Sequence, residues 1–134
     1  MTASIVVDAS AIINSFARIG PVASQAREMM RGRMLNAPHL IDLEVANALR
    51  RQVRVGLVDG PRAELHLRAL SRMPVRRHAH QVLLARVWRL RDNFSAYDAS
   101  YVALAEVMRA PLLTADLRLA EAAEQYCEVE RLDE

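Results

Sequence analysis

Short apolar runs alternate along the chain with longer stretches in which apolar residues recur every three or four positions. The short runs predict buried strands, at residues 4–8, 34–38, 74–78, 111–115 and 126–132. The longer stretches predict amphipathic helices, at residues 9–18, 20–32, 39–56, 58–73, 79–93, 94–108 and 116–125. Strands joined by crossover helices imply a parallel sheet with helices on both faces. We therefore expect one α/β domain, residues 1–134, built as an α/β/α sandwich around a mostly parallel sheet.

One of these helices carries a charge in its apolar stripe. In "FSAYDASYVALAEVM", residues 94–108, helical spacing places Asp98 on the same face as Tyr101, Val102 and Ala105. A carboxylate directed at the interior needs either a structural or a chemical reason.

Three further acids occupy corresponding places in the predicted fold. Asp8 ends the first strand, Asp116 directly follows the strand at 111–115, and Glu44 falls in the apolar stripe of the helix at 39–56, in its second turn. The carboxyl ends of parallel strands and the first turns of the following helices form one rim of the sheet, where ligands bind. We expect the four acids to converge at that rim.

Each acid also has an ordinary interpretation on its own. Asp98 and Asp116 could cap helices, Asp8 could form a turn, and Glu44 could extend to solvent. Four like charges within a few ångströms repel one another and lose hydration, so such a cluster persists when a cation neutralises it. Ligands that are all carboxylate oxygens favour Mg²⁺ or Mn²⁺ over zinc.

A carboxylate site of this kind suits a phosphodiesterase and predicts a nuclease, because a divalent cation can activate water and stabilise charge on a phosphodiester. Two hydroxyls fit as supporting groups. Ser10 lies two residues after Asp8 and Thr114 two residues before Asp116, where each could orient a carboxylate or a water. Helix capping is an equal alternative for both hydroxyls.

Four segments hold the acids, and they are "VVDASAII", "LIDLEVANALRR", "AYDASYVALAE" and "LLTADLRLA". In order and spacing, over nearly the whole chain, they resemble the PIN-domain ribonucleases, and especially the VapC toxins of bacterial toxin–antitoxin pairs. It implies a PIN-like fold with catalytic, metal-binding acids at Asp8, Glu44, Asp98 and Asp116. It also implies an endoribonuclease that depends on Mg²⁺ or Mn²⁺ and leaves a 3′-hydroxyl and a 5′-phosphate. A homodimer and a cognate VapB-type antitoxin are the partners that it implies. Asn47, within the "EVANAL" segment, is expected to pack, with lining the pocket as the alternative.

Two other functions remain open. A catalytically idle PIN-like module would bind RNA or protein only, and it predicts that some of the acids are lost, whereas all four are present. A metal-dependent nuclease acting in RNA maturation or on DNA would share the same site. A short reading frame directly upstream that encodes a DNA-binding N-terminus would favour the toxin interpretation.

Composition narrows the class of protein further. The 134 residues are 52% hydrophobic and 25% charged, as in a globular domain. No run approaches the ~20 apolar residues of a membrane span, so we expect a cytoplasmic protein. All 18 basic residues are arginine, which excludes Walker A nucleotide-binding proteins, haloacid-dehalogenase phosphatases and receiver domains, because each requires a lysine.

Charge is unevenly distributed along the chain. Residues 1–91 hold 15 arginines and 6 acids, an excess of +9, and residues 92–134 hold 3 arginines and 10 acids, an excess of −7. The basic part suits a polyanion such as RNA, although solvated helix faces are an equal alternative. The arginines that we expect to hold backbone phosphates are Arg50, Arg51, Arg54, Arg86, Arg89 and Arg91.

Several other side chains have simpler interpretations. His78 and His80 are expected to lie in a solvated basic segment, since no further metal ligands are near them in sequence. Trp88, Met29 and Met30 are expected to fill the core or a dimer contact instead of stacking on bases.

Overall fold

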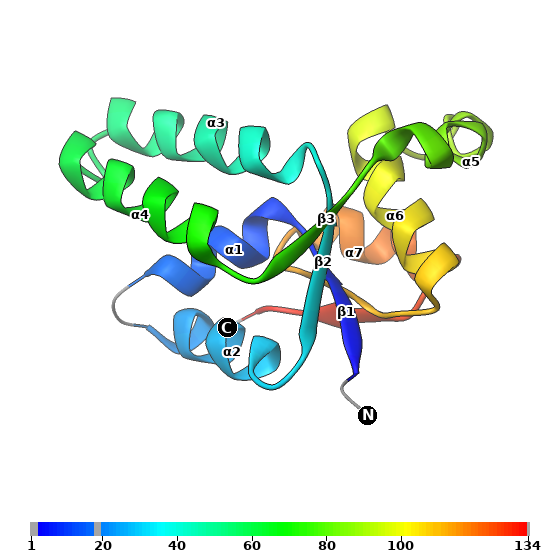
Figure 1. Cartoon of the computed structure of the whole chain (residues 1–134), viewed down its shortest axis with the longest axis horizontal. Coiled ribbons are helices and arrows are strands. Elements are labelled where there is room, and N and C mark those ends of the chain that lie inside the picture. Colours follow the sequence, from blue (N-terminus) through cyan, green and yellow to red (C-terminus); the bar gives the residue numbers. More distant parts are fainter. Residues whose placement is uncertain (1–2, 18–19, 134) are drawn as a thin grey trace.

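The computed structural model describes residues 3–17 and 20–133. A five-stranded sheet forms its centre (Figure 1), with the order β3-β2-β1-β4-β5 and every pairing parallel. The strands are β1 (Ser4–Val7), β2 (Met34–Pro38), β3 (Val75–His78), β4 (Leu112–Thr114) and β5 (Val129–Arg131). The predicted α/β fold with a parallel sheet is confirmed.

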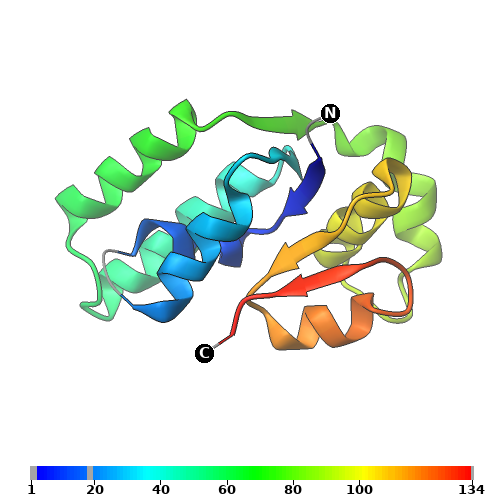
Figure 2. The same ribbon diagram turned by 90° about the horizontal axis from the view of Figure 1, so that it is seen from below.

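Helices cover both faces of the sheet. In Figure 2, α1 to α4 lie on one side of the strands and α5 to α7 on the other. The elements are α1 (Ala9–Phe16), α2 (Pro21–Met30), α3 (Ile41–Arg54), α4 (Gly60–Arg72), the 3-10 helix η1 (His80–Leu83), α5 (Leu84–Arg89), α6 (Ala96–Met108) and α7 (Leu117–Ala123). In the described ranges, no helix combines the length and the apolar character needed to cross a membrane.

The strand order places a crevice at the centre of the sheet. β1 pairs with β2 on one side and with β4 on the other, so the connections leave β1 in opposite directions. In open parallel sheets, such a switch point opens a crevice at the carboxyl ends of the two strands. Asp8 follows β1 directly, and Asp116 lies two residues beyond the end of β4. The topology therefore brings these two acids to one place.

The apolar character of α6 explains its position in the core. All seven residues from 99 to 105 are buried, and the helix packs against β1 and β2. A helix that is apolar on all sides belongs in the interior of a domain. Because Asp98 immediately precedes this buried stretch, the fold carries its carboxylate to the edge of the core.

The largest differences in extent concern two of the predicted helices and the C-terminal strand. The single helix expected at 79–93 is η1 followed by the short α5, which ends where the Leu90 amide donates to the carbonyls of both Arg86 and Val87. α3 begins at Ile41, because the His39 amide still bonds to β3 through the His78 carbonyl. Glu44 is consequently in the first turn of α3, not the second.

The C-terminal strand and one aromatic residue also differ from the predictions. β5 is shorter than predicted, because the amides of Tyr126 and Cys127 turn back to the carbonyl of Ala123. Trp88 is 67% exposed, so it does not fill the core, and the alternative of a dimer contact stays a prediction. Met30 is buried and Met29 packs against the core, as expected.

Candidate active site

Asp8 is a buried carboxylate held by three hydrogen-bond donors. It is 5% exposed and caps α1 by accepting the amide of Ala11 on Oδ1, at 3.0 Å. The Ser10 hydroxyl also donates to Oδ1, at 2.6 Å, and the Thr114 hydroxyl donates to Oδ2. Burial raises the pKa of Asp8, although all three hydrogen bonds act in the opposite direction. This carboxylate is fixed in place before any ligand arrives.

Ser10 and Thr114 tie two strand ends together around Asp8. The Ser10 hydroxyl accepts the amide of Ala115 at 2.8 Å, and the Thr114 hydroxyl accepts the amide of Asp116 at 3.0 Å. Each hydroxyl thus orients a carboxylate while it satisfies the backbone after β4. The structure favours the orienting alternative for both residues, because the helix caps here are Asp8 and Asp116.

Glu44 is oriented by Tyr101, which the sequence placed only in the apolar stripe of its helix. The hydroxyl of Tyr101, a side chain 1% exposed, donates to Glu44 Oε1 at 2.6 Å. The bond joins α3 to α6 across the crevice, and it reflects the general need of a buried tyrosine hydroxyl for a partner. Burial is the main cause of a raised Glu44 pKa, and the tyrosine bond lowers that pKa. Burial also raises the pKa of Tyr101 far above its ordinary range, so its hydroxyl remains a donor.

Asp98 and Asp116 differ in their relation to the helix ends. Asp116 caps α7, with Oδ1 accepting the amides of Arg118 and Leu119. At α6 the cap is Ser95, whose hydroxyl accepts the amide of Asp98 at 3.1 Å. Among the described residues, the Asp98 carboxylate itself makes no hydrogen bond. Capping therefore accounts for Asp116 but not for the half-buried side chain of Asp98.

The four acids act on one another electrostatically. The charge of Asp116 raises the pKa of both Asp8 and Asp98, and the charges of Asp98 and Asp8 raise that of Glu44. In each case, burial is the larger cause and repulsion adds to it. The four side chains, from four separate elements, form one coupled acidic centre. The rim argument placed the four acids in one region of the fold, and a shared cation site among them stays a prediction.

The donor chemistry of the acidic centre suits a hard divalent cation. All four side chains offer carboxylate oxygens, which Mg²⁺ and Mn²⁺ prefer. In the part of the chain that the structure describes, hydrogen bonds occupy one oxygen of Glu44 and one of Asp116, so each keeps a free oxygen. Within residues 3–17 and 20–133, no three side chains of His, Cys, Asp or Glu already lie close enough together to share a metal ion.

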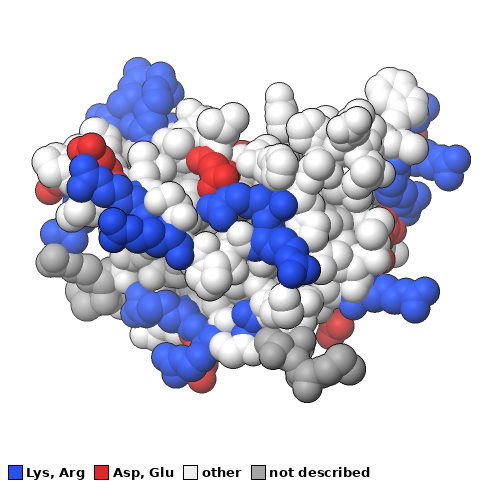
Figure 3. Space-filling view, viewed as in Figure 1, with Lys and Arg blue, Asp and Glu red and all other residues white. Residues whose placement is uncertain are grey.

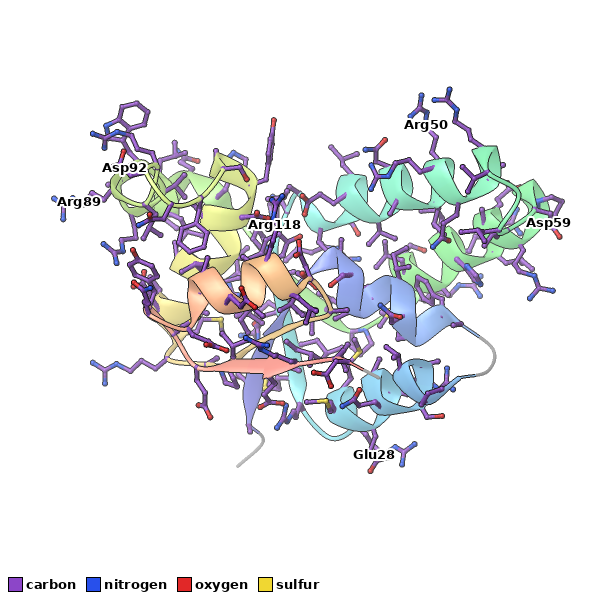
Figure 4. The ribbon with its side chains drawn as sticks, turned by 180° about the vertical axis from the view of Figure 1, so that it is seen from behind. Glu28, Arg50, Asp59, Arg89, Asp92 and Arg118 are labelled. Atoms are coloured by element: carbon purple, nitrogen blue, oxygen red, sulfur yellow. The ribbon has the colours of Figure 1, made fainter. Side chains whose placement is uncertain are left out.

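The arginines expected to bind phosphate occupy different environments. Arg86 donates through Nε and Nη2 to both carboxylate oxygens of Glu106, each at 2.8 Å, so its guanidinium is committed to an ion pair between α5 and α6. Arg50 and Arg89 extend into solvent at opposite ends of the molecule (Figure 4). Arg51 lines a hollow beside the acidic centre together with Glu44.

The remaining basic residues extend this picture. Arg54 is exposed in the last turn of α3, and Arg91 lies over the Trp88 ring, 4.6 Å from its centroid. Arg118, which sequence reasoning missed, lies near the middle of the molecule in Figure 4. Its positive charge lowers the pKa of Asp98 against the larger effect of burial. On the face in Figure 3, arginines gather over α4 and β3.

Asn47 and the histidines were assigned structural or solvated positions from the sequence. Asn47 is exposed and lines the same hollow as Arg51, so the expectation that it packs is wrong and the alternative holds. His78 is half-buried and its Nε2 lies 2.9 Å from Oδ1 of the buried Asn36, so it is not solvated. His80 is exposed, as expected.

Comparison with known proteins gives a consistent result. A family model described as "PIN domain" matches residues 5–125. Ribonuclease VapC9 of Mycobacterium tuberculosis is 44% identical over 128 residues, covering 93% of this chain and 95% of that protein.

Two solved structures share the fold. One is a protein of Pyrobaculum aerophilum, with a TM-score of 0.69 and 26% identity, covering 98% of this chain and 84% of that one. The other is VapBC2 of Rickettsia felis bound to a DNA fragment from their promoter, with a TM-score of 0.70 at 9% identity over 97% and 99% of the two chains. At so low an identity, the second likeness concerns the fold alone.

Proposed function

The chain belongs to the PIN-domain family and, within it, to the VapC toxin ribonucleases, and on this basis we propose that it is an endoribonuclease dependent on Mg²⁺ or Mn²⁺. Its substrate would be cellular RNA, which places its action in the cytoplasm. Cleavage would leave a 3′-hydroxyl and a 5′-phosphate and would stop growth by removing RNA needed for translation.

The observation that carries this proposal is the acidic centre at the switch point of the sheet. Asp8, Glu44, Asp98 and Asp116 come from four elements, and three of them have pKa values raised by burial and by one another. A fold that concentrates unneutralised carboxylates in this way sacrifices stability for a ligand-binding function. A structural role would be served better by paired or exposed acids.

The four acids differ in how many of their carboxylate oxygens are already hydrogen-bonded. Asp8 is immobilised by Ser10, Thr114 and the start of α1, so it would provide the rigid side of the cation site. Glu44, Asp98 and Asp116 keep free oxygens and would complete the site. A divalent cation held there would supply activation of water and neutralisation of the charge that builds on the phosphodiester.

Two protein partners are part of this proposal. A cognate VapB-type antitoxin would neutralise the enzyme by placing a cationic group among the acids, where a negative pocket favours it. A second copy of the chain would cover exposed apolar side chains around η1, α5 and α6, which are Val82, Leu84, Trp88 and Tyr97. Leu84 and Tyr97 also line an apolar hollow of about 160 Å³, and a homodimer interface of this kind is enriched in such residues.

The test is cleavage of end-labelled RNA by purified protein with Mg²⁺, with Mn²⁺ and with EDTA. The control variant is Asp116→Asn, because asparagine caps a helix nearly as well as aspartate while it removes a proposed cation ligand. Wild type should cleave with either metal and not in EDTA, and the folded variant should be inactive. Undiminished cleavage in EDTA would refute the metal requirement, and no cleavage of any RNA would refute the ribonuclease. Expression should slow growth, and co-expression of the antitoxin should restore it.

A further inference from the structure

A hollow of about 360 Å³ lies directly beside the acidic centre, between α1 and α3. Its lining combines an apolar floor with polar groups, and consists of Ala9, Ser10, Ile13, Asn14, Glu44, Asn47, Ala48 and Arg51. Two of these, Ser10 and Glu44, belong to the site described above. Figure 1 shows α1 and α3 both running away from the strand ends, and the lining residues extend along both helices, to Asn14 and to Arg51.

The wall formed by α3 changes in charge along its length. Glu44, Asn47, Ala48 and Arg51 are spaced by three, four and seven residues, so they share one helix face. At 1.5 Å of rise per residue, Arg51 stands roughly 10 Å further from the rim than Glu44. The hollow therefore passes from a carboxylate at the acidic centre, through a neutral amide, to a guanidinium.

The guanidinium of Arg51 is available to a ligand. Across the described chain, no ion pair is made by Arg51, whereas Arg77 and Arg86 are each held by both oxygens of a carboxylate. The Asn47 side chain is exposed at the same hollow. An exposed guanidinium beside an amide is suited to the oxygens of a phosphate, which accept charge-assisted hydrogen bonds in a fork geometry.

We propose that this hollow binds a backbone phosphate of single-stranded RNA, next to the phosphodiester that is cut at the acidic centre. Arg51 binds the phosphate oxygens, and Asn47 donates a hydrogen bond to the same nucleotide. This subsite rests on the proposed function and adds a direction to it, because the RNA strand leaves the acidic centre between α1 and α3. Arg50, its neighbour in sequence, does not line the hollow and extends into solvent (Figure 4), so it has no part in this subsite.

The test is the salt dependence of binding to a fluorescein-labelled, mixed-sequence single-stranded RNA, measured by anisotropy. An Asp98→Asn background suppresses cleavage. The plot of log affinity against log salt has a negative slope. Loss of one phosphate contact in single-stranded RNA makes this slope shallower by about 0.7. Arg51→Gln should show this decrease and bind roughly tenfold more weakly at low salt. Asn47→Ala should weaken binding without changing the slope, because an amide carries no charge.

Arg72→Gln is the matched control, since it removes the same charge from an exposed arginine in the last turn of α4, outside the hollow. Its slope should stay that of the background protein. Equal decreases for Arg72→Gln and Arg51→Gln would show only general attraction to a basic surface and would overturn the subsite. An unchanged slope in Arg51→Gln together with lost binding of the antitoxin would assign the hollow to the protein partner instead. If wild type cleaves no RNA, the proposed function itself fails, and that result is distinct from both others.

Discussion

Replacing Tyr101 with phenylalanine tests whether the buried hydroxyl holds Glu44 in its working position. The substitution removes one oxygen from a side chain 1% exposed and leaves the ring in place, so it deletes the 2.6 Å bond to Glu44 with little other change. A hydrogen bond to a charged group contributes about 1.5–3 kcal/mol to stability. Glu44 is only half-buried and can regain water, so we expect a loss near the lower end, about 1–2 kcal/mol. For a domain of this size, that corresponds to a melting temperature lower by roughly 3–6 °C.

The Tyr101→Phe substitution should affect RNA cleavage more strongly than it affects the free energy of unfolding. Loss of a group that orients a metal ligand typically costs about 10–100-fold in metal affinity or activity. The Tyr101 bond also lowers the pKa of Glu44, so the variant should raise that pKa and move the acidic limb of the cleavage profile to higher pH. The measurements are urea unfolding, cleavage against Mg²⁺ concentration, and cleavage against pH.

Tyr97→Phe provides the control on the same helix. Tyr97 is 65% exposed and stands one turn before Tyr101, so loss of its hydroxyl should leave stability and cleavage unchanged. The reasoning would be refuted if Tyr101→Phe matched Tyr97→Phe in stability, in Mg²⁺ requirement and in pH profile. Glu44 would then need no partner on α6, and the link across the crevice would be incidental.

Three further predictions concern other parts of the structure. For Asp98, burial and the charge of Asp116 raise the pKa above the ordinary 3.8. The stability that the protonated side chain contributes is therefore fully present below about pH 4 and is lost as the pH rises through the pKa of Asp98 in the folded protein. Thermal unfolding in EDTA should therefore show Asp98→Asn equal to wild type at about pH 4 and more stable at neutral pH, and Mg²⁺ should then stabilise wild type more than the variant. Thr114→Val, at a side chain 0% exposed, removes bonds to Asp8 and from the Asp116 amide and should cost about 2–3 kcal/mol in urea unfolding. Leu84→Glu should yield a monomer by light scattering if the apolar surface around α5 forms the homodimer, and an unchanged mass would place the interface elsewhere.

The sequence determined the order and type of nearly every element, because periodicity is a local property of the chain. The β-branched run before Asp8 and the apolar run before Asp116 both form parallel strands, as their patterns predict. Since parallel strands end at one rim, the same reasoning located the four acids together. Local patterns were less informative at 79–93, where the same apolar spacing fits a continuous helix or the 3-10 turn and short helix that form.

Only the tertiary structure decided which side chains meet. The bond between Glu44 and Tyr101 joins residues 57 apart in sequence, and that between Asp8 and Thr114 joins residues 106 apart. Nothing local distinguishes Arg86, which is held by Glu106, from Arg51, which faces the hollow. These partners are set by the strand order and by the way α3 and α6 pack across the switch point. Helical spacing gives the face on which a side chain lies, but packing between elements determines what that face contacts.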